Sequence, residues 1–166
     1  LKPSNILVTP DRQVHLLDFG IAKLMEGDRT RETALTQAAG AALTPAYASP
    51  EQIRGEPLGT ASDVYSLAVA AYELLAGVKP YRLQRGSAAE LEEQIASVAQ
   101  APLASRLATD ETTRRQLRGN LDAILNKALK KSPADRYVSI DAMARDIQSH
   151  LSGQAIVARP DSLRMR

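Results

Sequence analysis

The chain contains no cysteine and no tryptophan, and Phe19 is its only phenylalanine. The absence of cysteine excludes disulfides, cysteine-ligated zinc and thiol catalysis, and it fits a reducing compartment such as the cytoplasm. No long hydrophobic run is present either. The most apolar stretch, residues 67–78, is interrupted by Tyr72 and Glu73 and is too short to span a bilayer. We therefore expect no membrane segment in this chain.

An excess of charge of one sign is also missing. The 166 residues include 21 basic and 19 acidic side chains, a formal net charge of +2. This balance gives no broad electrostatic case for a nucleic-acid partner. The length corresponds to about one domain with a real core. No charged-then-apolar leader opens the chain, so we expect no export signal at its start. Because the first residue is Leu1 and not Met, we expect the chain to begin inside a longer reading frame.

The first 20 residues favour a small β-hairpin. Two β-prone runs, residues 6–8 and 14–17, flank a stretch rich in turn-forming residues. A turn centred between positions 11 and 12 would place Asn5 opposite Asp18. Opposed Cα atoms on antiparallel strands lie roughly 4.5–5.5 Å apart. Two oxygen-bearing side chains are therefore expected to meet at the open end of the hairpin.

Residues 21–59 lack sustained periodicity and contain scattered glycines, which is typical of a long functional or disordered loop. A helix over 60–76 is predicted next, because Thr60 and Asp63 form a capping-box-like start and Gly77 is a stop signal. Apolar side chains occur on nearly all sides of this helix, so it has almost no polar face. We expect it to be buried on most sides.

Three amphipathic helices are predicted beyond it, each from a capping residue and an apolar stripe. Their caps are Ser87, Asn120 and Ser139. The last of these helices is expected to turn four apolar side chains toward the core, those of Ile140, Met143, Ile147 and Leu151. Residues 100–118 are interpreted as a connector, and residues 154–166 as an apolar-basic tail.

Three motifs occur in order along the chain: Leu1-Lys2-Pro3-Ser4-Asn5, Asp18-Phe19-Gly20 and Ala48-Ser49-Pro50-Glu51. Together they resemble the second half of a eukaryotic-like serine/threonine protein kinase of the bacterial type. The family's catalytic loop runs His-Arg-Asp, four residues, Asn, and Asn5 matches its last residue. The resemblance implies a mainly α fold, the kinase C-terminal lobe of a small β-hairpin plus a helix bundle, with the N-lobe absent.

On this resemblance, residues 1–152 are a partial kinase domain and residues 153–166 a basic tail. Within the domain, residues 18–51 match the activation segment and residues 60–152 the helical lobe. The His, Arg and catalytic Asp of the family would precede Leu1. We therefore expect a fragment that is inactive alone and active only in a longer product.

Asn5 and Asp18 match the family's metal ligands, and through the metal they would bind the cofactor ATP. Mg²⁺ prefers oxygen ligands and keeps several waters, so it needs only one or two protein oxygens besides phosphates. An amide oxygen and a carboxylate at one end of a hairpin suit that need. The alternative is a glycine-terminated strand with an incidental turn aspartate, which Asp-Phe-Gly alone would favour.

Other residues of the motifs match catalytic positions of the family. Lys2 resembles the lysine that marks Ser/Thr specificity and offsets charge on the transferred phosphate; a solvated loop lysine is the alternative. Thr44 resembles the threonine that hydrogen-bonds the catalytic Asp and seats the acceptor peptide, although Leu43 replaces the usual Gly before it. Phe19 and Gly20 complete the metal-binding motif, and in the family the packing of that Phe sets active and inactive states.

Three further residues match structural positions. The resemblance implies that Glu51 and Arg136 form a buried bidentate ion pair that fixes the activation segment to the helical lobe. Two unrelated surface charges are the alternative. Asp63 has two compatible interpretations, as part of the helix start and as the family's anchor for the backbone of the catalytic loop.

The implied function is transfer of the γ-phosphate of ATP, with Mg²⁺, to a serine or threonine of a protein substrate. The implied partner is the missing N-lobe of the same kinase. A non-catalytic kinase-like binding or scaffold module is the alternative, although such a module does not need metal ligands. Without the family's upstream helix against residues 60–76, a patch of ~400 Å² would face water. At ~25 cal/mol/Å² this forfeits roughly 10 kcal/mol, so we expect the isolated chain to be molten or aggregated.

Overall fold

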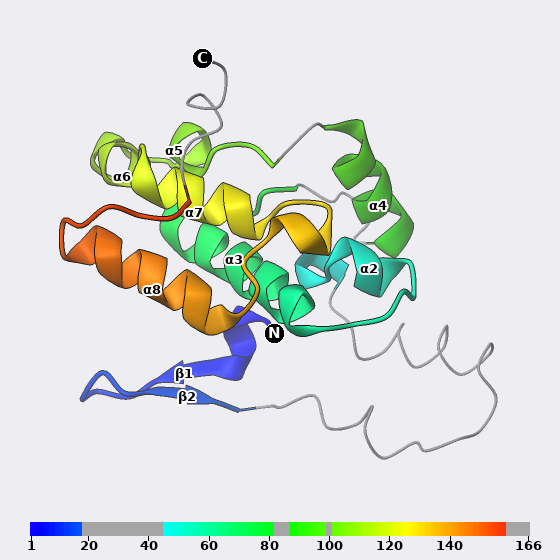
Figure 1. Ribbon diagram of the computed structural model, residues 1–166, viewed down its shortest axis with the longest axis horizontal. Helices are drawn as coiled ribbons and strands as arrows, with labels where there is room; N and C mark the ends of the chain where they lie inside the picture. Colours follow the sequence, from blue (N-terminus) through cyan, green and yellow to red (C-terminus); the bar gives the residue numbers. More distant parts are fainter. Residues whose placement is uncertain (18–44, 82–86, 99–100, 159–166) are drawn as a thin grey trace.

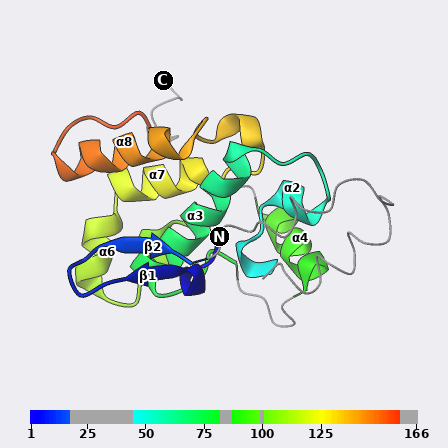
Figure 2. The same cartoon turned by 90° about the horizontal axis from the view of Figure 1, so that it is seen from below.

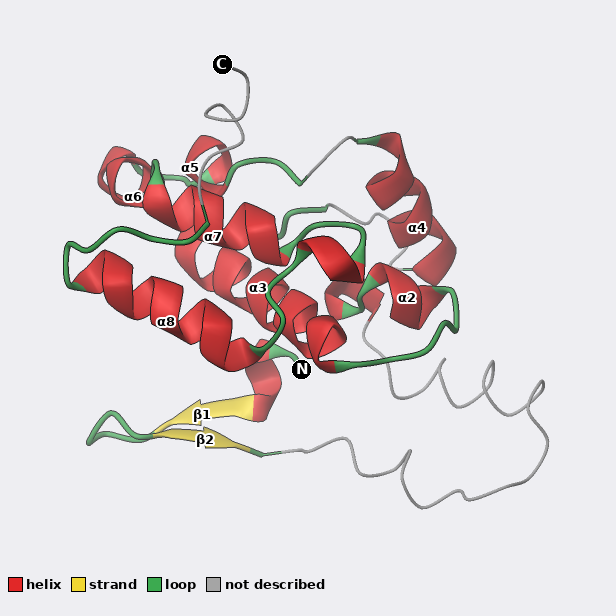
Figure 3. Cartoon of the chain, viewed as in Figure 1, coloured by secondary structure: helices red, strands yellow, loops and turns green. Residues whose placement is uncertain are grey.

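The structure is a computed structural model, and it describes residues 1–17, 45–81, 87–98 and 101–158. Within these residues the chain is mainly helical with one two-stranded hairpin (Figure 3), which confirms the predicted fold class. The helices are α2 (Pro50–Ile53), α3 (Thr60–Ala76), α4 (Ala88–Ser97), α5 (Ala104–Leu107), α6 (Glu111–Leu117), α7 (Asn120–Ala128) and α8 (Ile140–Leu151). The strands are β1 (Ile6–Val8) and β2 (Val14–Leu16), and the 3₁₀ turns are η1 (Pro3–Asn5), η3 (Pro45–Tyr47) and η4 (Pro133–Asp135). None of these helices has the length and apolar character needed to cross a membrane.

Helix α3 forms the centre of the core, as its lack of a polar face predicts. Val64, Ala68 and Tyr72 are almost fully buried, and α5, α6, α7 and α8 pack against the helix (Figure 1). Burial of such apolar surface is the main favourable term in folding. The last turn differs, because Leu74 is 69% exposed and Leu75 is 41% exposed. The helix therefore has an uncovered apolar stretch near its C-terminal end.

The start of α3 differs from the prediction. Gly59 is the N-cap and no side chain caps the helix, so the predicted capping by Thr60 is wrong. The Thr60 hydroxyl instead donates to the carbonyl oxygen of Val138, 3.1 Å away. A tertiary contact thus uses the hydroxyl that the local pattern assigns to the cap.

The end of α3 is as predicted. Gly77 adopts a φ of +73°, and its N–H donates to the carbonyl oxygen of Glu73 at 2.9 Å. A Cβ at this position would approach only Thr109, at 3.9 Å or more, which is an ordinary contact. Any cost of a side chain at position 77 therefore comes from the left-handed backbone.

Gly77→Ala should lower the free energy of unfolding by about 1 kcal/mol, because alanine disfavours the left-handed region. Urea unfolding of the protein expressed from its complete gene measures this change. Gly77→Asn is the matched comparison and should lose less stability, because asparagine tolerates that conformation. Equal losses in the two variants would contradict the backbone explanation.

The predicted caps of two outer helices are confirmed. The hydroxyl oxygens of Ser87 and Ser139 each accept from the backbone N–H three residues later, at the starts of α4 and α8. Along α8, Met143 is buried as expected, but Ile140 and Leu151 are exposed, contrary to the prediction. The helix packs against α3 and α7, and the apolar residues at its first and last positions are not covered.

Two short helices, α5 and α6, lie within residues 100–118, so the predicted connector over this range is wrong. The Asp110 carboxylate caps α6 by accepting from the N–H of Thr113 at 2.8 Å. The predicted cap of α7 is also wrong, because Gly119 is the N-cap and Asn120 is the first helical residue. Helices of one or two turns are too short to show a clear hydrophobic period.

The hairpin forms, but its register is one residue away from the predicted one. Asn5 lies opposite Leu17, whose N–H donates to the Asn5 carbonyl oxygen at 2.9 Å. The predicted pairing of Asn5 with Asp18 is therefore wrong, and Asp18 itself lies outside the described residues. The loop causes this difference in register. The N–H of Thr9 donates to the carbonyl oxygen of Gln13 at 3.0 Å, so the turn is centred on the residue midway between these two and not between positions 11 and 12.

Apolar side chains of the hairpin are exposed on both of its faces. They are Leu7, Val8, Val14, Leu16 and Leu17. Figures 1 and 2 place the hairpin on the side of the helical bundle away from α4. Since a two-stranded hairpin is at best marginally stable by itself in water, a covering protein segment would stabilise it.

Candidate functional site

Residues 45–53 form a short turn followed by α2. The hydroxyl oxygen of Ser49 accepts from the N–H of Gln52 at 3.4 Å, and the Gln52 side chain accepts from the N–H of Ser49 at 2.8 Å. Pro50 follows at the first helical position, where proline is favoured. This reciprocal capping box was not predicted, although its Ser-x-x-Gln spacing is the known signal. It holds Glu51 in the first turn of α2, where the side chain is buried.

Glu51 and Arg136 form the buried bidentate ion pair expected from the sequence, although they lie 85 residues apart. Arg136 Nη1 donates to Glu51 Oε1 at 2.6 Å, and Nη2 donates to Oε2 at 2.8 Å. Glu51 is 2% exposed and Arg136 is 4% exposed. Paired charge-assisted hydrogen bonds of this kind are strong and demand a defined geometry.

Every N–H of the Arg136 guanidinium has an acceptor. An arginine side chain has five N–H donors, and those not used by Glu51 bind three carbonyl oxygens at 2.7–2.9 Å, those of Ala61, Lys130 and Lys131. The guanidinium carbon lies 4.8 Å from the centre of the Tyr65 ring. The Ser62 hydroxyl adds a hydrogen bond to Glu51 at 2.7 Å. These partners, which no sequence pattern signals, join residues 45–53 to α3 and to the loop before α8.

The surroundings of Glu51 keep it ionised. Burial by itself would raise the pKa of its carboxyl group, but the hydrogen bonds from Arg136 and Ser62 outweigh burial and lower the pKa to about 2. An acid–base catalyst works best with a pKa near the operating pH. The ion pair therefore has the properties of a structural anchor.

A second cluster holds the start of the same segment. The Tyr47 hydroxyl donates to Glu73 Oε2 of α3 at 2.5 Å. Lys79 Nζ lies 3.7 Å from Glu73 Oε1 and 4.7 Å from the centre of the Tyr47 ring. Burial, followed by the Glu73 carboxylate, raises the pKa of Tyr47 to about 12, so the hydroxyl remains a donor. Sequence reasoning missed this cluster, because Tyr47 and Glu73 are 26 residues apart and belong to no shared motif.

Lys2 and Asn5 lie at either end of η1, at the entrance to the hairpin. The N–H of Asn5 donates to the Lys2 carbonyl oxygen at 3.0 Å, and the Leu17 N–H holds the carbonyl of Asn5. Among the described residues, the side-chain oxygen of Asn5 receives only a long 3.5 Å contact, from the Ser4 hydroxyl. An amide oxygen with unused lone pairs, on a backbone held at both sides, suits one ligand position of Mg²⁺.

The other candidates are not brought together with the ion pair. Asp63 is exposed in the first turn of α3, and in the described part of the chain no hydrogen bond or ion pair joins it to Glu51. Nor does that part contain a group of three or more histidines and carboxylates able to hold a metal ion. The predicted site residues outside the described ranges are Asp18, Phe19, Gly20 and Thr44.

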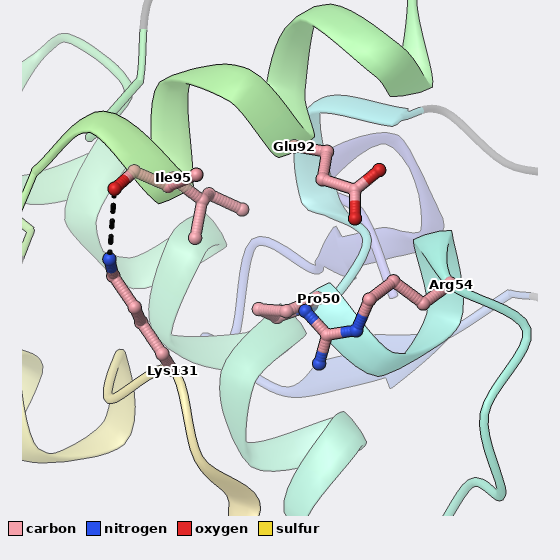
Figure 4. A pocket seen from close by; sticks show the side chains of 6 residues that line it. Pro50, Arg54, Glu92, Ile95 and Lys131 are labelled. Atoms are coloured by element: carbon pink, nitrogen blue, oxygen red, sulfur yellow. Dashed lines mark hydrogen bonds between the residues drawn. The ribbon is translucent and has the colours of Figure 1, made fainter.

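A pocket of about 320 Å³ opens between α2, α4 and the loop after α7 (Figure 4). It is lined by Pro50, Arg54, Glu92, Ile95, Ala96 and Lys131. Lys131 Nζ donates to the Ala96 carbonyl oxygen at 3.4 Å, and Arg54 is paired with Glu56 at 2.6 Å. Both cations are thus engaged, and none of the candidate site residues within the described ranges lines this pocket.

Known proteins resemble the chain over nearly its whole length. The family description "protein kinase domain" matches residues 1–150. A probable serine/threonine-protein kinase of Streptomyces coelicolor is 37% identical over 158 residues, which are 95% of this chain and 22% of that protein. The serine/threonine-protein kinase PknB of Mycobacterium leprae is 33% identical over 154 residues, 93% of this chain and 23% of that protein. The serine/threonine-protein kinase pkn3 of Myxococcus xanthus is 35% identical over 161 residues, 90% of this chain and 26% of that protein. The chain therefore spans only about a quarter of the length of these relatives.

Proposed function

Because the chain belongs to the protein kinase family, we propose that it forms the helical lobe of a bacterial-type serine/threonine kinase. The proposed reaction moves the γ-phosphate of ATP to a serine or threonine hydroxyl of a protein substrate. The observation that supports this most is the buried Glu51–Arg136 pair. Two residues that match structural positions of the family meet across the fold, at the end of the segment that matches the activation segment.

In this proposal Asn5 and Asp18 hold Mg²⁺ together with the phosphates of ATP. The metal ion, when bound, neutralises charge that develops on the phosphate oxygens. Asn5 offers an amide oxygen from a backbone held on both sides by Lys2 and Leu17, and Asp18 offers a carboxylate. Lys2 adds a cation that offsets charge on the transferred phosphate.

The remaining matched residues have positioning roles in the proposal. Thr44 hydrogen-bonds the catalytic carboxylate and seats the acceptor peptide, and Asp63 anchors the backbone of the catalytic loop. Phe19 and Gly20 set the conformation of the metal-binding motif that Asp18 opens. The buried anchor at Glu51 fixes the end of the segment that presents Thr44.

We also propose that an ATP-binding N-lobe of the same kinase completes the site. The apolar side chains exposed on the hairpin support this, because a covering domain would remove them from water. Leu74, which is exposed on α3, is instead expected to be covered by the family's upstream helix. Use of ATP places the proposed activity in the cytoplasm. The absence of cysteine agrees with a reducing compartment.

Phosphate transfer by the protein expressed from its complete gene tests the proposal. With γ-labelled ATP and a generic protein substrate, serine or threonine should become labelled, and chelation of Mg²⁺ should abolish the labelling. Asp18→Ala should reduce the rate by roughly 10²–10³-fold, as expected for loss of a group that stabilises transition-state charge. Asp141→Ala is the matched control, because Asp141 is exposed on α8, and it should transfer phosphate at the normal rate.

Two outcomes would contradict the proposal. Labelling that survives Asp18→Ala unchanged would exclude the proposed metal site. An absence of labelling under all conditions would instead favour the alternative, a kinase-like binding or scaffold module. The nucleotide sequence before the codon for Leu1 is an independent check, since the family's motif predicts that it encodes His-Arg-Asp.

A further inference from the structure

The segment after α8 folds back onto the helical bundle. The chain turns at Gly153, which has a φ of +69°, and Figure 1 shows it running from the end of α8 back toward α7. Ala158 is 2% exposed in the core, and Ile156 packs against the same core. We call residues 154–158 the exit strap. The family match ends at residue 150, so the exit strap lies beyond the matched region.

One buried carboxylate holds the exit strap. Asp146 of α8 is 2% exposed, and it accepts from the N–H of Val157 at 2.7 Å and from the N–H of Ala158 at 2.8 Å. The Tyr137 hydroxyl donates to the same carboxylate at 2.7 Å. Burial by itself would raise the pKa of Asp146, but these donors outweigh burial and lower it. A buried carboxylate that loses such donors is costly, so Asp146 and the exit strap stabilise each other.

The same carboxylate is connected to the ion pair of the candidate site. Tyr137 directly follows Arg136, and both side chains are buried. Lys127 of α7 lies over the Tyr137 ring, with Nζ 4.6 Å from its centre. The loop that precedes Tyr137 supplies two of the carbonyl oxygens that bind Arg136. Packed and hydrogen-bonded groups therefore run without a break from the exit strap to Glu51, and networks of this kind can carry energetic coupling between two places in a fold.

We propose that the exit strap positions the loop 130–137 and, through Arg136, the segment 45–53. The chain that leaves the domain is thereby coupled to that segment: displacement of the exit strap loosens the Glu51–Arg136 anchor, and a seated exit strap tightens it. This coupling holds whether or not the chain takes part in phosphate transfer.

Val157→Pro tests the coupling from the strap side. Proline has no N–H, so the variant removes one donor to Asp146 without changing α8. The Val157 side chain is 75% exposed, and Val157→Ala is therefore a matched control that keeps the N–H. Hydrogen exchange of the protein expressed from its complete gene, followed by mass spectrometry, reports each region separately.

In Val157→Pro we expect exchange in residues 154–158 to rise roughly tenfold or more, as for loss of a hydrogen bond to a charged group. Exchange in residues 45–53 and 130–137 should rise about threefold or more, the scale of coupling through a contiguous network. Val157→Ala should exchange like the wild type. Tyr137→Phe, which keeps the ring and removes one donor to Asp146, should accelerate exchange in the same regions by a smaller factor.

Three results would overturn the proposal. Unchanged exchange of residues 154–158 in Val157→Pro would show that Asp146 does not hold the exit strap. Faster exchange of the exit strap with unchanged exchange of residues 45–53 and 130–137 would exclude the coupling. An equal effect of Val157→Ala would assign the change to the lost side chain instead of the lost N–H.

Discussion

Arg136→Ala should lower the free energy of unfolding by about 3–5 kcal/mol, the cost of breaking a buried ion pair from one side. The variant leaves the Glu51 carboxylate buried without its counter-charge, and it also removes the donors to three backbone carbonyl groups. Native-state hydrogen exchange of the α3 amides, in protein expressed from its complete gene, measures the change.

Two variants define the cause of this loss. Arg136→Lys keeps the charge but has three donors on a flexible stem, so it should recover only part of the stability. Arg54→Ala breaks an exposed pair with Glu56 and should cost less than about 1 kcal/mol. Full recovery of stability in Arg136→Lys would mean that the charge alone stabilises the fold. An equal loss of stability in Arg54→Ala would mean that burial of the ion pair does not contribute.

The same anchor should make stability depend on pH. The pKa of Glu51 is lowered from 4.5 to about 2 in the folded protein, so the unfolded chain takes up this proton more readily. The stabilisation is complete above about pH 4.5 and is lost as the pH falls through about 2. A shift of this size corresponds to about 3 kcal/mol. In Arg136→Ala the loss of stability over this window should be shallower, and an unchanged pH profile would contradict the assignment.

Asn5→Ala should reduce phosphate transfer by roughly 10²–10³-fold, because it removes an oxygen proposed to hold the metal ion that stabilises the transferred charge. The Asn5 backbone bonds to Lys2 and Leu17 do not involve its side chain, so the hairpin should keep its structure. Steady-state assays over a range of Mg²⁺ concentrations, with the product of the complete gene, measure the effect.

A metal-ligand role has a signature that a structural role lacks. Excess Mg²⁺ should restore part of the activity of Asn5→Ala, because a weakened site fills at higher metal concentration. Asn120→Ala is the matched control, since Asn120 is exposed at the start of α7, and it should show the wild-type Mg²⁺ dependence. Activity of Asn5→Ala that is lost equally at all Mg²⁺ concentrations would argue against metal binding by this residue.

The parts of the fold that follow from neighbouring residues are predicted in part, since two helix caps are correct and the caps at Thr60 and Asn120 are wrong. Helix α3 was predicted because its apolar side chains leave no polar face and Gly77 ends it, and the caps at Ser87 and Ser139 lie three residues from the N–H groups that they bind. The sequence pattern does not predict helices α5 and α6, because a helix of one or two turns is too short to show a hydrophobic periodicity. The hairpin register was wrong by one residue, since it depends on the hydrogen bonds of the loop at Thr9 and Gln13.

Sequence alone determined the family resemblance, the central helix and the candidate residues Asn5, Glu51 and Arg136, because motif spacing and hydrophobic period are properties of the linear chain. Only the tertiary structure decided what surrounds them. The partners of Arg136, the Tyr47–Glu73 contact and the hold of Asp146 on the exit strap join residues that lie far apart in sequence or in different elements. Such contacts depend on how the helices pack, because no rule of local backbone geometry relates groups separated by more than about one helical turn.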